Sequence, residues 1–396
     1  MNLLVLLNRI PFPLNDGGAI GTLHFVKGYA EAGCNVTILA MNTTKHFVSE
    51  ANTQLALGKY GKVHTVEINN NIKPVPALAN LFSTESYIIK RFISHNFQQK
   101  LLELLTANKF DVVHLDGLQT AAYIDVIRKH SSAKIAMRAH NVEYKIWERV
   151  YENEKNFLKK WYVKIQSKRL CTFEKNAIAN LDVTLAISKE DEDALLQLSP
   201  GANTIIVPAG MDIDEREPVV SKNNNLFFIG SFDWMPNLQG IEWFFENIWQ
   251  SVSNTFPEIK FFIAGKKMPE SIYKLKNDTV IPVGEVANAK DFVTSNDIMI
   301  VPIISGSGIR IKILEGMALG KPVIATTIAA EGLGLTHNEN ILIANTAAEF
   351  IECIGKCTND FSIRQKIAIN AHRFALENFQ NKRIIEKLIR YYQSLL

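Results

Sequence analysis

Short apolar runs alternate with stretches of helical periodicity along the first half of the chain. Runs of this kind, bounded by turn residues, are typical of parallel strands that are buried on both faces. The predicted strands are Leu3–Leu7, Asn35–Ala40, Val63–Glu67, Val112–Leu115, Lys134–Met137, Val183–Ile187 and Thr204–Val207. The predicted helices between them are Ile20–Ala32, Glu85–Ala107, Thr120–Lys129, Tyr144–Asn180 and Glu190–Leu198. This alternation predicts a doubly wound, Rossmann-like α/β domain.

A second alternation follows a break between Pro208 and Asn225 that is rich in proline, asparagine and charged residues. Its predicted strands are Leu226–Ile229, Lys260–Ala264, Val280–Val283, Ile298–Val301 and Val323–Ala325. Its predicted helices are Gly240–Ser253, Ala287–Thr294, Ile309–Leu319 and Ala347–Thr358, and a last helical run covers Ile363–Leu396. We therefore predict one α/β domain over residues 1–205, a second over residues 206–375, and a surplus helix over residues 376–396.

The composition is that of a globular protein and excludes several classes of partner. The chain of 396 residues is 47% hydrophobic and 21% charged, with a net charge of +3, which is too mild to predict nucleic-acid binding. The four cysteines form no disulfide framework, and Cys353 and Cys357 lack the further ligands that a zinc site needs. We expect reduced thiols and no bound metal.

The apolar start of the chain does not have the layout of a signal peptide. It has no basic region before it, and Asn8 and Arg9 follow it directly. No apolar stretch approaches the ~18 residues that suggest a membrane-spanning helix. We expect a cytoplasmic protein.

Candidate functional residues lie beyond the predicted strands. Ligands of open α/β sheets bind at the carboxyl ends of the strands, so two such domains are expected to hold a ligand in a cleft between them. The first candidate is the turn Asn15–Ala19, which contains Asp16, Gly17 and Gly18. Paired glycines before a helix let backbone amides approach a phosphate or a sugar. The alternative is a tight turn that needs glycine only for its backbone conformation.

The second candidate follows the strand Lys134–Met137. His140 and Asn141 come just beyond this strand, where the cleft would open, and Asp116 holds the equivalent place after Val112–Leu115. A histidine there can serve catalysis, whereas a core histidine would stand inside the apolar run. A capping role for His140 is the alternative.

The third candidate is the stretch Pro302–Val323, which combines a loop of small residues, a helix, and a Gly-Lys-Pro stop before the next strand. Free amides at the start of the helix favour a diphosphate. Lys312 and Glu315 share a helix face, where they suit a phosphate and the ribose hydroxyls of a sugar nucleotide. The candidate residues are Ser307, Gly308, Arg310, Lys312 and Glu315. A surface ion pair on a capped helix is the alternative.

Two further stretches carry charge. Lys155–Arg169 holds six basic residues and no acidic one, with an apolar stripe at helical spacing. This stretch is either a packed helix with a solvated basic face or a peripheral contact with anionic lipid at the inner membrane face. The sequence Asp212-Ile213-Asp214 resembles a metal-binding motif but follows a strand and reads as linker.

Six motifs, taken in order, resemble glycosyltransferase family 4, the group 1 transferases of the GT-B fold. They are Asp16–Gly18, Arg138–Tyr144, Ile187–Asp191, Val207–Asp212, Ile229–Asn237 and Gly308–Val323. The resemblance implies a retaining transferase that uses a nucleotide-diphosphate sugar, such as a UDP- or GDP-sugar, without a bound metal or other cofactor. It also implies an acceptor-side first domain, a nucleotide-binding second domain, and a C-terminal helix that crosses back onto the first.

The resemblance assigns roles to matching positions. Glu315 matches the second glutamate of an E-x7-E motif that binds ribose, Gly17 and Gly18 match a glycine loop near the donor phosphate, and His140 matches a histidine near the donor sugar. Two positions depart from the family. Ser307 stands where the first glutamate is usual, and Gly230–Asp233 replaces a usual arginine and lysine. Arg310 and Lys312 are expected to supply that missing positive charge.

The expected activity is hexosyl transfer to a glycan or lipid-linked acceptor in polysaccharide or glycoconjugate synthesis. Two alternatives keep the same nucleotide site. One is a sugar-nucleotide epimerase or phosphorylase of the same fold, and the other is a non-catalytic nucleotide-sugar-binding protein. A nicotinamide dehydrogenase is disfavoured, because no G-x-G-x-x-G follows a strand.

Overall fold

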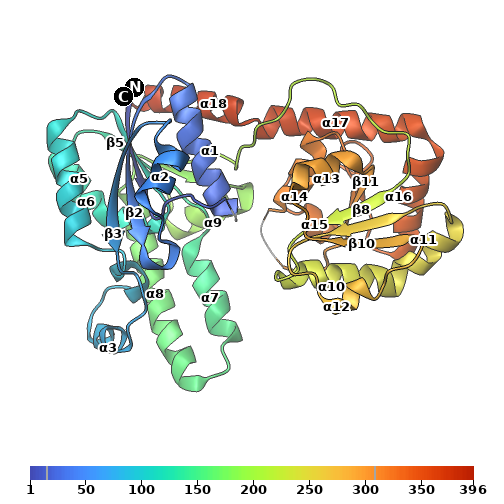
Figure 1. Cartoon of the computed structure of the whole chain (residues 1–396). Coiled ribbons are helices and arrows are strands. Elements are labelled where there is room, and N and C mark those ends of the chain that lie inside the picture. The colour runs from blue at the N-terminus through green and yellow to red at the C-terminus, as the bar shows by residue number, and fades with distance from the viewer. Residues whose placement is uncertain (15–16, 307–308) are drawn as a thin grey trace. The chain divides into compact units, whose positions relative to one another are not determined.

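The computed structural model describes residues 1–14, 17–306 and 309–396 (Figure 1). The chain divides into two compact units, each described by itself. Unit 1 comprises Met1–Met211 and Asn381–Leu396, and unit 2 comprises Asp212–Gln380. The division thus falls after Met211 rather than after residue 205, and the last segment begins at Asn381 rather than at residue 376.

Unit 1 is built on a seven-stranded parallel sheet with the order β3-β2-β1-β4-β5-β6-β7. The strands are β1 (Asn2–Leu7), β2 (Asn35–Thr43), β3 (Lys62–Ile68), β4 (Val112–Asp116), β5 (Lys134–Arg138), β6 (Val183–Ala186) and β7 (Thr204–Ile206). Successive residues of a strand point to opposite faces, so Leu4 and Leu6 of β1 join one core while Leu3 and Val5 join the other. This two-sided burial explains the uninterrupted apolar runs of the sequence.

Helices cover both faces of this sheet (Figure 1). Helices α5, α6, α8 and α9 contribute to one core, and α1, α2 and α18 contribute to the other. The helices of unit 1 are α1 (Gly17–Glu31), α2 (Glu50–Leu57), α3 (Pro74–Ala79), α4 (Tyr87–Lys90), α5 (His95–Ala107), α6 (Ile124–His130), α7 (Glu143–Asn153), α8 (Phe157–Ala179), α9 (Lys189–Leu198) and α18 (Asn381–Leu395), with 3-10 turns η1 (Thr44–His46), η2 (Asn80–Phe82) and η3 (Leu118–Tyr123). No helix in the described ranges is long and apolar enough to cross a membrane.

The C-terminal helix α18 belongs to unit 1, although the residues before it belong to unit 2. Asn381 donates its side-chain amide to the carbonyl of His24 on α1 at 2.8 Å. Deeper in the core, Nδ1 of His114 lies 3.0 Å from the hydroxyl of Tyr29 and 3.1 Å from that of Tyr392. Burial lowers the pKa of His114 to about 4, so the ring is neutral at neutral pH. The surplus helix of the sequence therefore completes the core of the first unit.

Unit 2 contains a six-stranded parallel sheet with the order β10-β9-β8-β11-β12-β13. The strands are β8 (Leu226–Ile229), β9 (Phe261–Ala264), β10 (Val280–Gly284), β11 (Ile298–Val301), β12 (Val323–Ala325) and β13 (Leu342–Ile343). The helices are α10 (Met235–Phe244), the π-helix η4 (Phe245–Trp249), α11 (Gln250–Thr255), α12 (Glu270–Tyr273), α13 (Ala289–Ser295), α14 (Ile311–Ala318), α15 (Thr327–Ala330), α16 (Ala347–Asn359) and α17 (Phe361–Phe379). The two sheets confirm the predicted α/β class of both halves.

Two long helices of the sequence prediction are broken in the structure. The predicted Glu85–Ala107 is split into α4 and α5, because Ser94 caps α5 by accepting the N–H of Phe97 at 3.4 Å. The predicted Tyr144–Asn180 is split into α7 and α8, because Asn156 caps α8 by accepting the N–H of Lys159 at 3.0 Å. Such caps satisfy the free amides at a helix start and fix where the helix begins.

Candidate functional site

The first candidate cluster of unit 1 lies at the carboxyl ends of its central strands. Strands β1, β4 and β5 are neighbours in the sheet, and the strand order reverses between β1 and β4. Such a switch point is where doubly wound sheets bind ligands. Asp116 is the last residue of β4 and pairs in register with Arg138, the last residue of β5. The sequence thus placed Asp116 correctly at a strand end.

Three donors surround the carboxyl group of Asp116. The Thr22 hydroxyl donates at 2.5 Å, Nε2 of His140 lies at 2.9 Å, and a guanidinium nitrogen of Arg138 lies at 3.4 Å. Asp116 is only 2% exposed, and burial alone would raise its pKa. The attraction and hydrogen bond of His140 and the charge of Arg138 outweigh that effect and hold the pKa of Asp116 below its usual range. The side chain is therefore an ionised, fully engaged carboxylate.

Arg138 connects this cluster to helix α1. Its buried guanidinium lies 4.3 Å from the ring centroid of Phe25, in a cation–π contact. A Cβ at Gly21 would approach a guanidinium nitrogen of Arg138 to 2.6 Å, so only glycine leaves room for the arginine at this turn of α1. The sequence analysis assigned no role to Gly21, Thr22 or Phe25. Their place within helix α1 carries no spacing pattern that would have indicated this role.

His140 presents its imidazole beside this carboxylate. It lies in the connection between β5 and α7, and its side chain is 19% exposed. The contact of Nε2 with Asp116 leaves Nδ1 without a hydrogen bond to any residue that the structure describes. A carboxylate that fixes one ring nitrogen orients the other for proton transfer or for stabilising charge.

The other predicted residues of unit 1 differ in placement. Gly17 and Gly18 are the first two residues of α1 and are half-buried. Thr22 lies one turn after Gly18, so this end of α1 is directed to the side of the sheet that holds Asp116. Asn141 is exposed, and Asp16 lies outside the described residues.

The candidate residues of unit 2 lie at the corresponding place in the second sheet. Strands β8 and β11 are neighbours where the strand order reverses. From α14, the Lys312 ammonium donates to Oδ1 of Asn237 at 2.7 Å and lies 4.3 Å from the ring centroid of Phe228. Burial lowers the pKa of Lys312 to about 7. A lysine held in this way can accept an anionic ligand as its counter-charge.

Gly230 explains how Lys312 reaches this position. A Cβ at Gly230 would stand 2.3 Å from Nζ of Lys312, so the glycine after β8 leaves the space that the ammonium occupies. The same residue begins Gly230–Asp233, the segment in which the resemblance implied an arginine and a lysine that this chain lacks. The Lys312 side chain from α14 therefore reaches the end of β8. That it replaces the missing basic residues in binding a ligand stays a prediction.

Arg310 and Glu315 flank Lys312 along α14. Arg310 is the N-cap residue of this helix, is 4% exposed, and lies 5.1 Å from the ring centroid of Trp234. Burial lowers its pKa. Glu315 is exposed. Ser307 and Gly308, which complete this predicted site, lie outside the described residues. The sequence analysis included Trp234 and Asn237 in the motif Ile229–Asn237 but did not identify them, or Phe228, as neighbours of Arg310 and Lys312. Contacts between segments far apart in the sequence leave no spacing pattern.

The described ranges contain no group of three His, Cys, Asp or Glu side chains arranged to hold a metal ion. Cys353 and Cys357 are buried free thiols on α16, and burial raises the pKa of Cys353 to about 11 and that of Cys357 to about 12. Metal independence remains a prediction, since residues 307 and 308 are not described.

Comparison with known families matches both units. The model of "Glycosyltransferase Family 4" matches residues 15–215, which is more than half of the chain. The model of "Glycosyl transferases group 1" matches residues 223–360. The chain belongs to glycosyltransferase family 4. The fold and the family that the motifs implied are thereby confirmed.

Solved structures of low sequence identity share the GT-B fold of this glycosyltransferase. HepE from Anabaena, in complex with UDP, has 14% identity and a TM-score of 0.68, with 100% of both chains covered. A glycosyltransferase from Rickettsia africae has 18% identity and a TM-score of 0.67, covering 100% of this chain and 98% of that one. A curated relative, an uncharacterized 44.6 kDa protein in the cps region of Klebsiella pneumoniae, is 25% identical over 406 residues, covering 98% of this chain and 99% of its own.

Proposed function

We propose that this glycosyltransferase moves a hexosyl group from a UDP- or GDP-sugar to a glycan or lipid-linked acceptor, with retention at the anomeric carbon and without a metal ion. The product belongs to the synthesis of a surface polysaccharide or glycoconjugate. The location of the relative from Klebsiella pneumoniae in a cps region supports this choice of pathway.

The observation that carries the proposal is the ammonium of Lys312 at the switch point of the second sheet. Desolvation lowers the pKa of this half-buried side chain to about 7, and the charge of Glu315 offsets that effect only in part, so the ammonium lacks a full counter-charge. A nucleoside diphosphate supplies that negative charge, and Arg310 at the start of α14 provides a second cation for it. Glu315 is proposed to bind the ribose hydroxyls. The complexes of HepE with UDP and with UDP-glucose support a uridine nucleotide as the first candidate.

In unit 1, His140 is proposed to act near the donor sugar. Asp116 orients its ring, and Gly17 and Gly18 offer backbone amides at the start of α1 for the donor phosphate or sugar. Asp16 and Asn141 are proposed to contact the acceptor. The roles of these residues rest on their resemblance to the family motifs and on their place at strand ends.

Peripheral contact with the inner membrane face is part of the proposal. The first turns of α8 expose Phe157 by 80%, Leu158 by 74% and Trp161 by 51% of their surfaces. Lys155–Arg169 places basic residues among them, which fits an anionic leaflet. An enzyme that acts on a lipid-linked acceptor gains from this position.

A thermal-shift screen tests the donor site directly. The protein is heated with UDP, GDP, ADP and their sugars, and a ligand at 100 times its Kd is expected to add about 2.7 kcal/mol of stability. The sugar that stabilises best is then assayed with acceptor extracts in the presence of EDTA, where transfer is expected to continue. Donor conversion without an acceptor would indicate an epimerase or phosphorylase, and tight binding without turnover would indicate a binding protein.

A further inference from the structure

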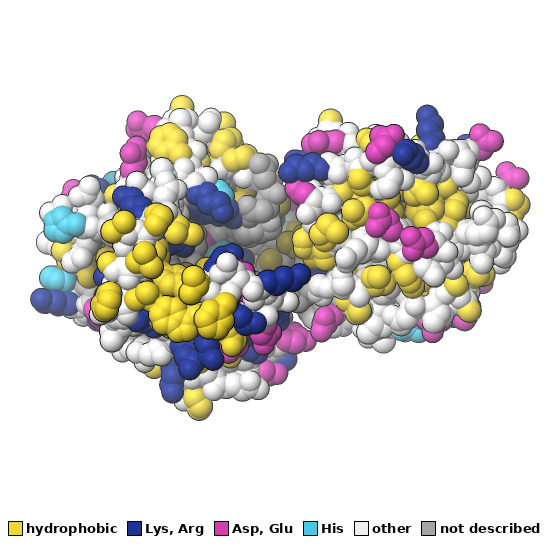
Figure 2. Space-filling model, turned by 90° about the horizontal axis from the view of Figure 1, so that it is seen from below, with side chains coloured by type: hydrophobic (Ala, Val, Ile, Leu, Met, Phe, Trp, Pro, Cys, Tyr) yellow, Lys and Arg dark blue, Asp and Glu magenta, His cyan; other side chains and the backbone are white. Residues whose placement is uncertain are grey.

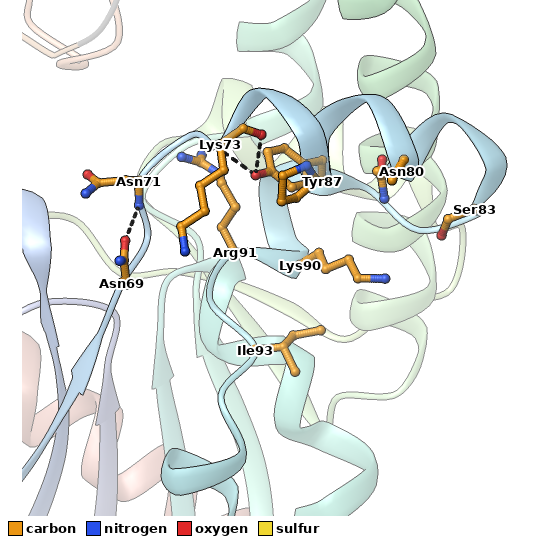
Figure 3. Close-up of a pocket in the computed structure, with 11 residues that line it drawn as sticks. Asn69, Asn71, Lys73, Asn80, Ser83, Tyr87, Lys90, Arg91 and Ile93 are labelled. Atoms are coloured by element: carbon orange, nitrogen blue, oxygen red, sulfur yellow. Dashed lines mark hydrogen bonds between the residues drawn. The ribbon is translucent and has the colours of Figure 1, made fainter.

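A basic pocket in unit 1 lies apart from the cluster around Asp116. It has a volume of about 410 Å³ and lies between the segment after β3 and helices α3 and α4 (Figure 3). Its polar lining includes Asn69, Asn71, Lys73, Tyr87, Lys90 and Arg91. The lining contains three basic side chains and no acidic one. A cavity of this composition favours an anionic ligand.

Two of the basic residues are set in place by their neighbours. The hydroxyl of Tyr87 lies 3.2 Å from the backbone nitrogen of Lys73 and 3.3 Å from its carbonyl, which fixes the chain before α3. Arg91 donates to the carbonyl of Asn70 at 2.9 Å, and its guanidinium lies 5.9 Å from the ring centroid of Tyr87. Figure 3 shows Lys73 beside Arg91 at the pocket.

The charges of the two lysines remain available to a ligand. The ammonium of Lys73 makes no ion pair or hydrogen bond with the residues that the structure describes, and Lys90 pairs with Glu85 at 2.7 Å on an exposed surface. Exposed pairs of this kind contribute little and exchange readily for a stronger anion.

The segment that forms the pocket also exposes large apolar side chains. Their exposed fractions are 69% for Ile72, 77% for Val75, 61% for Leu78, 97% for Phe82 and 49% for Ile93. Figure 2 shows hydrophobic side chains gathered on one face of unit 1, with Lys and Arg around them. Patches of this kind mark a contact with a partner or a membrane.

Helix α8 is joined to this segment. Arg169 donates to the carbonyls of Asn80 and Leu81 at 2.8 and 2.9 Å, and the backbone N–H of Tyr87 donates to Gln166 at 2.7 Å. Helix α8 and the segment 72–82 are therefore packed together, and the exposed apolar residues of both belong to the same part of unit 1. The basic pocket fits the anionic part of an amphiphilic ligand, and the apolar surface fits its hydrophobic part.

We propose that this pocket binds the phosphate group of a membrane-embedded lipid acceptor, whose hydrocarbon chain runs over the apolar side chains of the segment 72–82. The inference rests on the proposed function and specifies its acceptor. Strand β3 ends at Ile68, directly before the pocket residue Asn69, and all strands of the sheet are parallel. The pocket therefore lies at the same carboxyl edge as Asp116, where the transfer site is proposed.

Calorimetry with farnesyl diphosphate, a soluble phosphorylated isoprenoid, tests the pocket in the full chain. The protein is first saturated with the nucleotide chosen by the thermal-shift screen, so that the donor site is occupied. We expect the probe to bind. We expect farnesol, which lacks the phosphate groups, and inorganic diphosphate, which lacks the hydrocarbon chain, each to bind at least about tenfold more weakly.

Matched variants locate the binding. The double variant Lys73→Ala, Lys90→Ala is expected to lower the affinity for farnesyl diphosphate by about tenfold or more, because each charge-assisted hydrogen bond contributes substantially to the free energy of binding. Lys73→Arg, Lys90→Arg is expected to restore it. Lys109→Ala, an exposed lysine before β4 at the opposite edge of the sheet, is expected to leave it within about twofold.

Three outcomes overturn the proposal. Equal binding of inorganic diphosphate would make the pocket a site for free phosphate. Unchanged affinity in the double lysine variant would place the probe elsewhere, and equal binding of farnesol would remove the phosphate from recognition. Nucleotide affinity, measured in the same variants, is expected to stay unchanged. If the wild-type protein bound no nucleotide, that result would instead contradict the proposed donor site.

Discussion

Two charged side chains, Asp116 at the end of β4 and Lys312 on α14, differ in how their neighbours offset the effect of burial on the pKa. Asp116 is buried but receives three donors, so its pKa is held low and it stays ionised. Lys312 is held by the amide oxygen of Asn237 and a ring face, and burial brings its pKa down to about 7. The Asp116 carboxylate therefore has its hydrogen-bond partners without a ligand, whereas an added anion would stabilise the charged form of Lys312. This contrast suits a positioning role for Asp116 and a binding role for Lys312.

Loss of the imidazole is expected to slow the chemical step. His140→Ala should lower kcat by about a hundredfold or more and barely change nucleotide affinity. Asp116→Asn should also lower kcat, because an uncharged amide holds the His140 ring in place less firmly than the carboxylate does. Steady-state kinetics and calorimetry measure the two effects. His130→Ala, an exposed histidine at the end of α6, serves as the control. Full kcat in His140→Ala would remove histidine from the mechanism.

Nucleotide binding is expected to depend on pH through Lys312. Above its pKa of about 7 the free ammonium loses its proton, whereas a phosphate with a second pKa of about 6 is already charged. Affinity should therefore fall as pH rises from 7 to 9, by up to about tenfold per pH unit. Lys312→Ala should flatten this dependence and weaken binding about tenfold to a hundredfold at pH 7.

Glu315→Ala should weaken nucleotide binding by a similar factor while keeping the pH dependence, and Lys276→Ala, an exposed lysine of unit 2, should change neither. Calorimetry at several pH values distinguishes the variants. A pH profile that Lys312→Ala leaves unaltered would contradict the assignment of the titrating group.

At the scale of elements, the sequence predicted the strands better than the helices. Strands β1, β4, β5, β8 and β11 are buried on both faces, so their apolar runs stand out from the surrounding pattern. Helix ends depend instead on single caps such as Ser94 and Asn156, which interrupt runs that otherwise continue the helical period. Strand β13 has only two residues and gains its identity from pairing with β12, which no local pattern reveals.

The same reasoning separates the candidate residues that the sequence indicated from the neighbouring residues that it did not indicate. Asp116, His140 and Lys312 follow from their place after a strand or on the helix that follows a loop. Gly21 and Gly230 could not be predicted, because their importance lies in the side chains of Arg138 and Lys312 that reach over them from distant segments. The close approach of a side chain to a glycine in a distant segment depends on how the chain packs, and a single sequence does not reveal it.

Helix α18 is expected to be an integral part of unit 1. Tyr392 is fully buried against Tyr29 and His114, so Tyr392→Ala should lower the free energy of unfolding by about 3–5 kcal/mol through the cavity that it creates. Tyr392→Phe removes only the hydroxyl and should cost about 1 kcal/mol. Denaturant unfolding measures both changes.

The neighbouring Tyr391 supplies the control for this experiment. Its hydroxyl donates to Asn203 at 2.8 Å on an exposed surface, so Tyr391→Phe should change stability by less than about 0.5 kcal/mol. Equal losses in the two phenylalanine variants would show that the buried Tyr29–His114–Tyr392 contact does not secure the helix.

At the scale of the whole molecule, both units repeat one design. Each has a parallel sheet whose order reverses at its centre, and each places a charged group at that reversal: Asp116 with His140 in unit 1, and Lys312 in unit 2. The net charge of +3 hides this specialisation, because acidic residues elsewhere balance the local basic surfaces. The proposed function accordingly assigns the sugar to unit 1 and the leaving diphosphate to unit 2.

This division leads to the expected stereochemistry. A double displacement with a covalent intermediate needs a carboxylate free to attack the anomeric carbon, but both oxygens of Asp116 are engaged by Thr22, Arg138 and His140. An oxocarbenium-like sugar can instead be attacked on the face that the diphosphate leaves, with the diphosphate accepting the proton of the acceptor. The anomeric configuration is then retained. NMR of the anomeric proton of the product, compared with that of the donor, measures this outcome directly. An inverted linkage would require attack from the opposite face, with a base that abstracts the acceptor proton there, and would contradict the proposed mechanism.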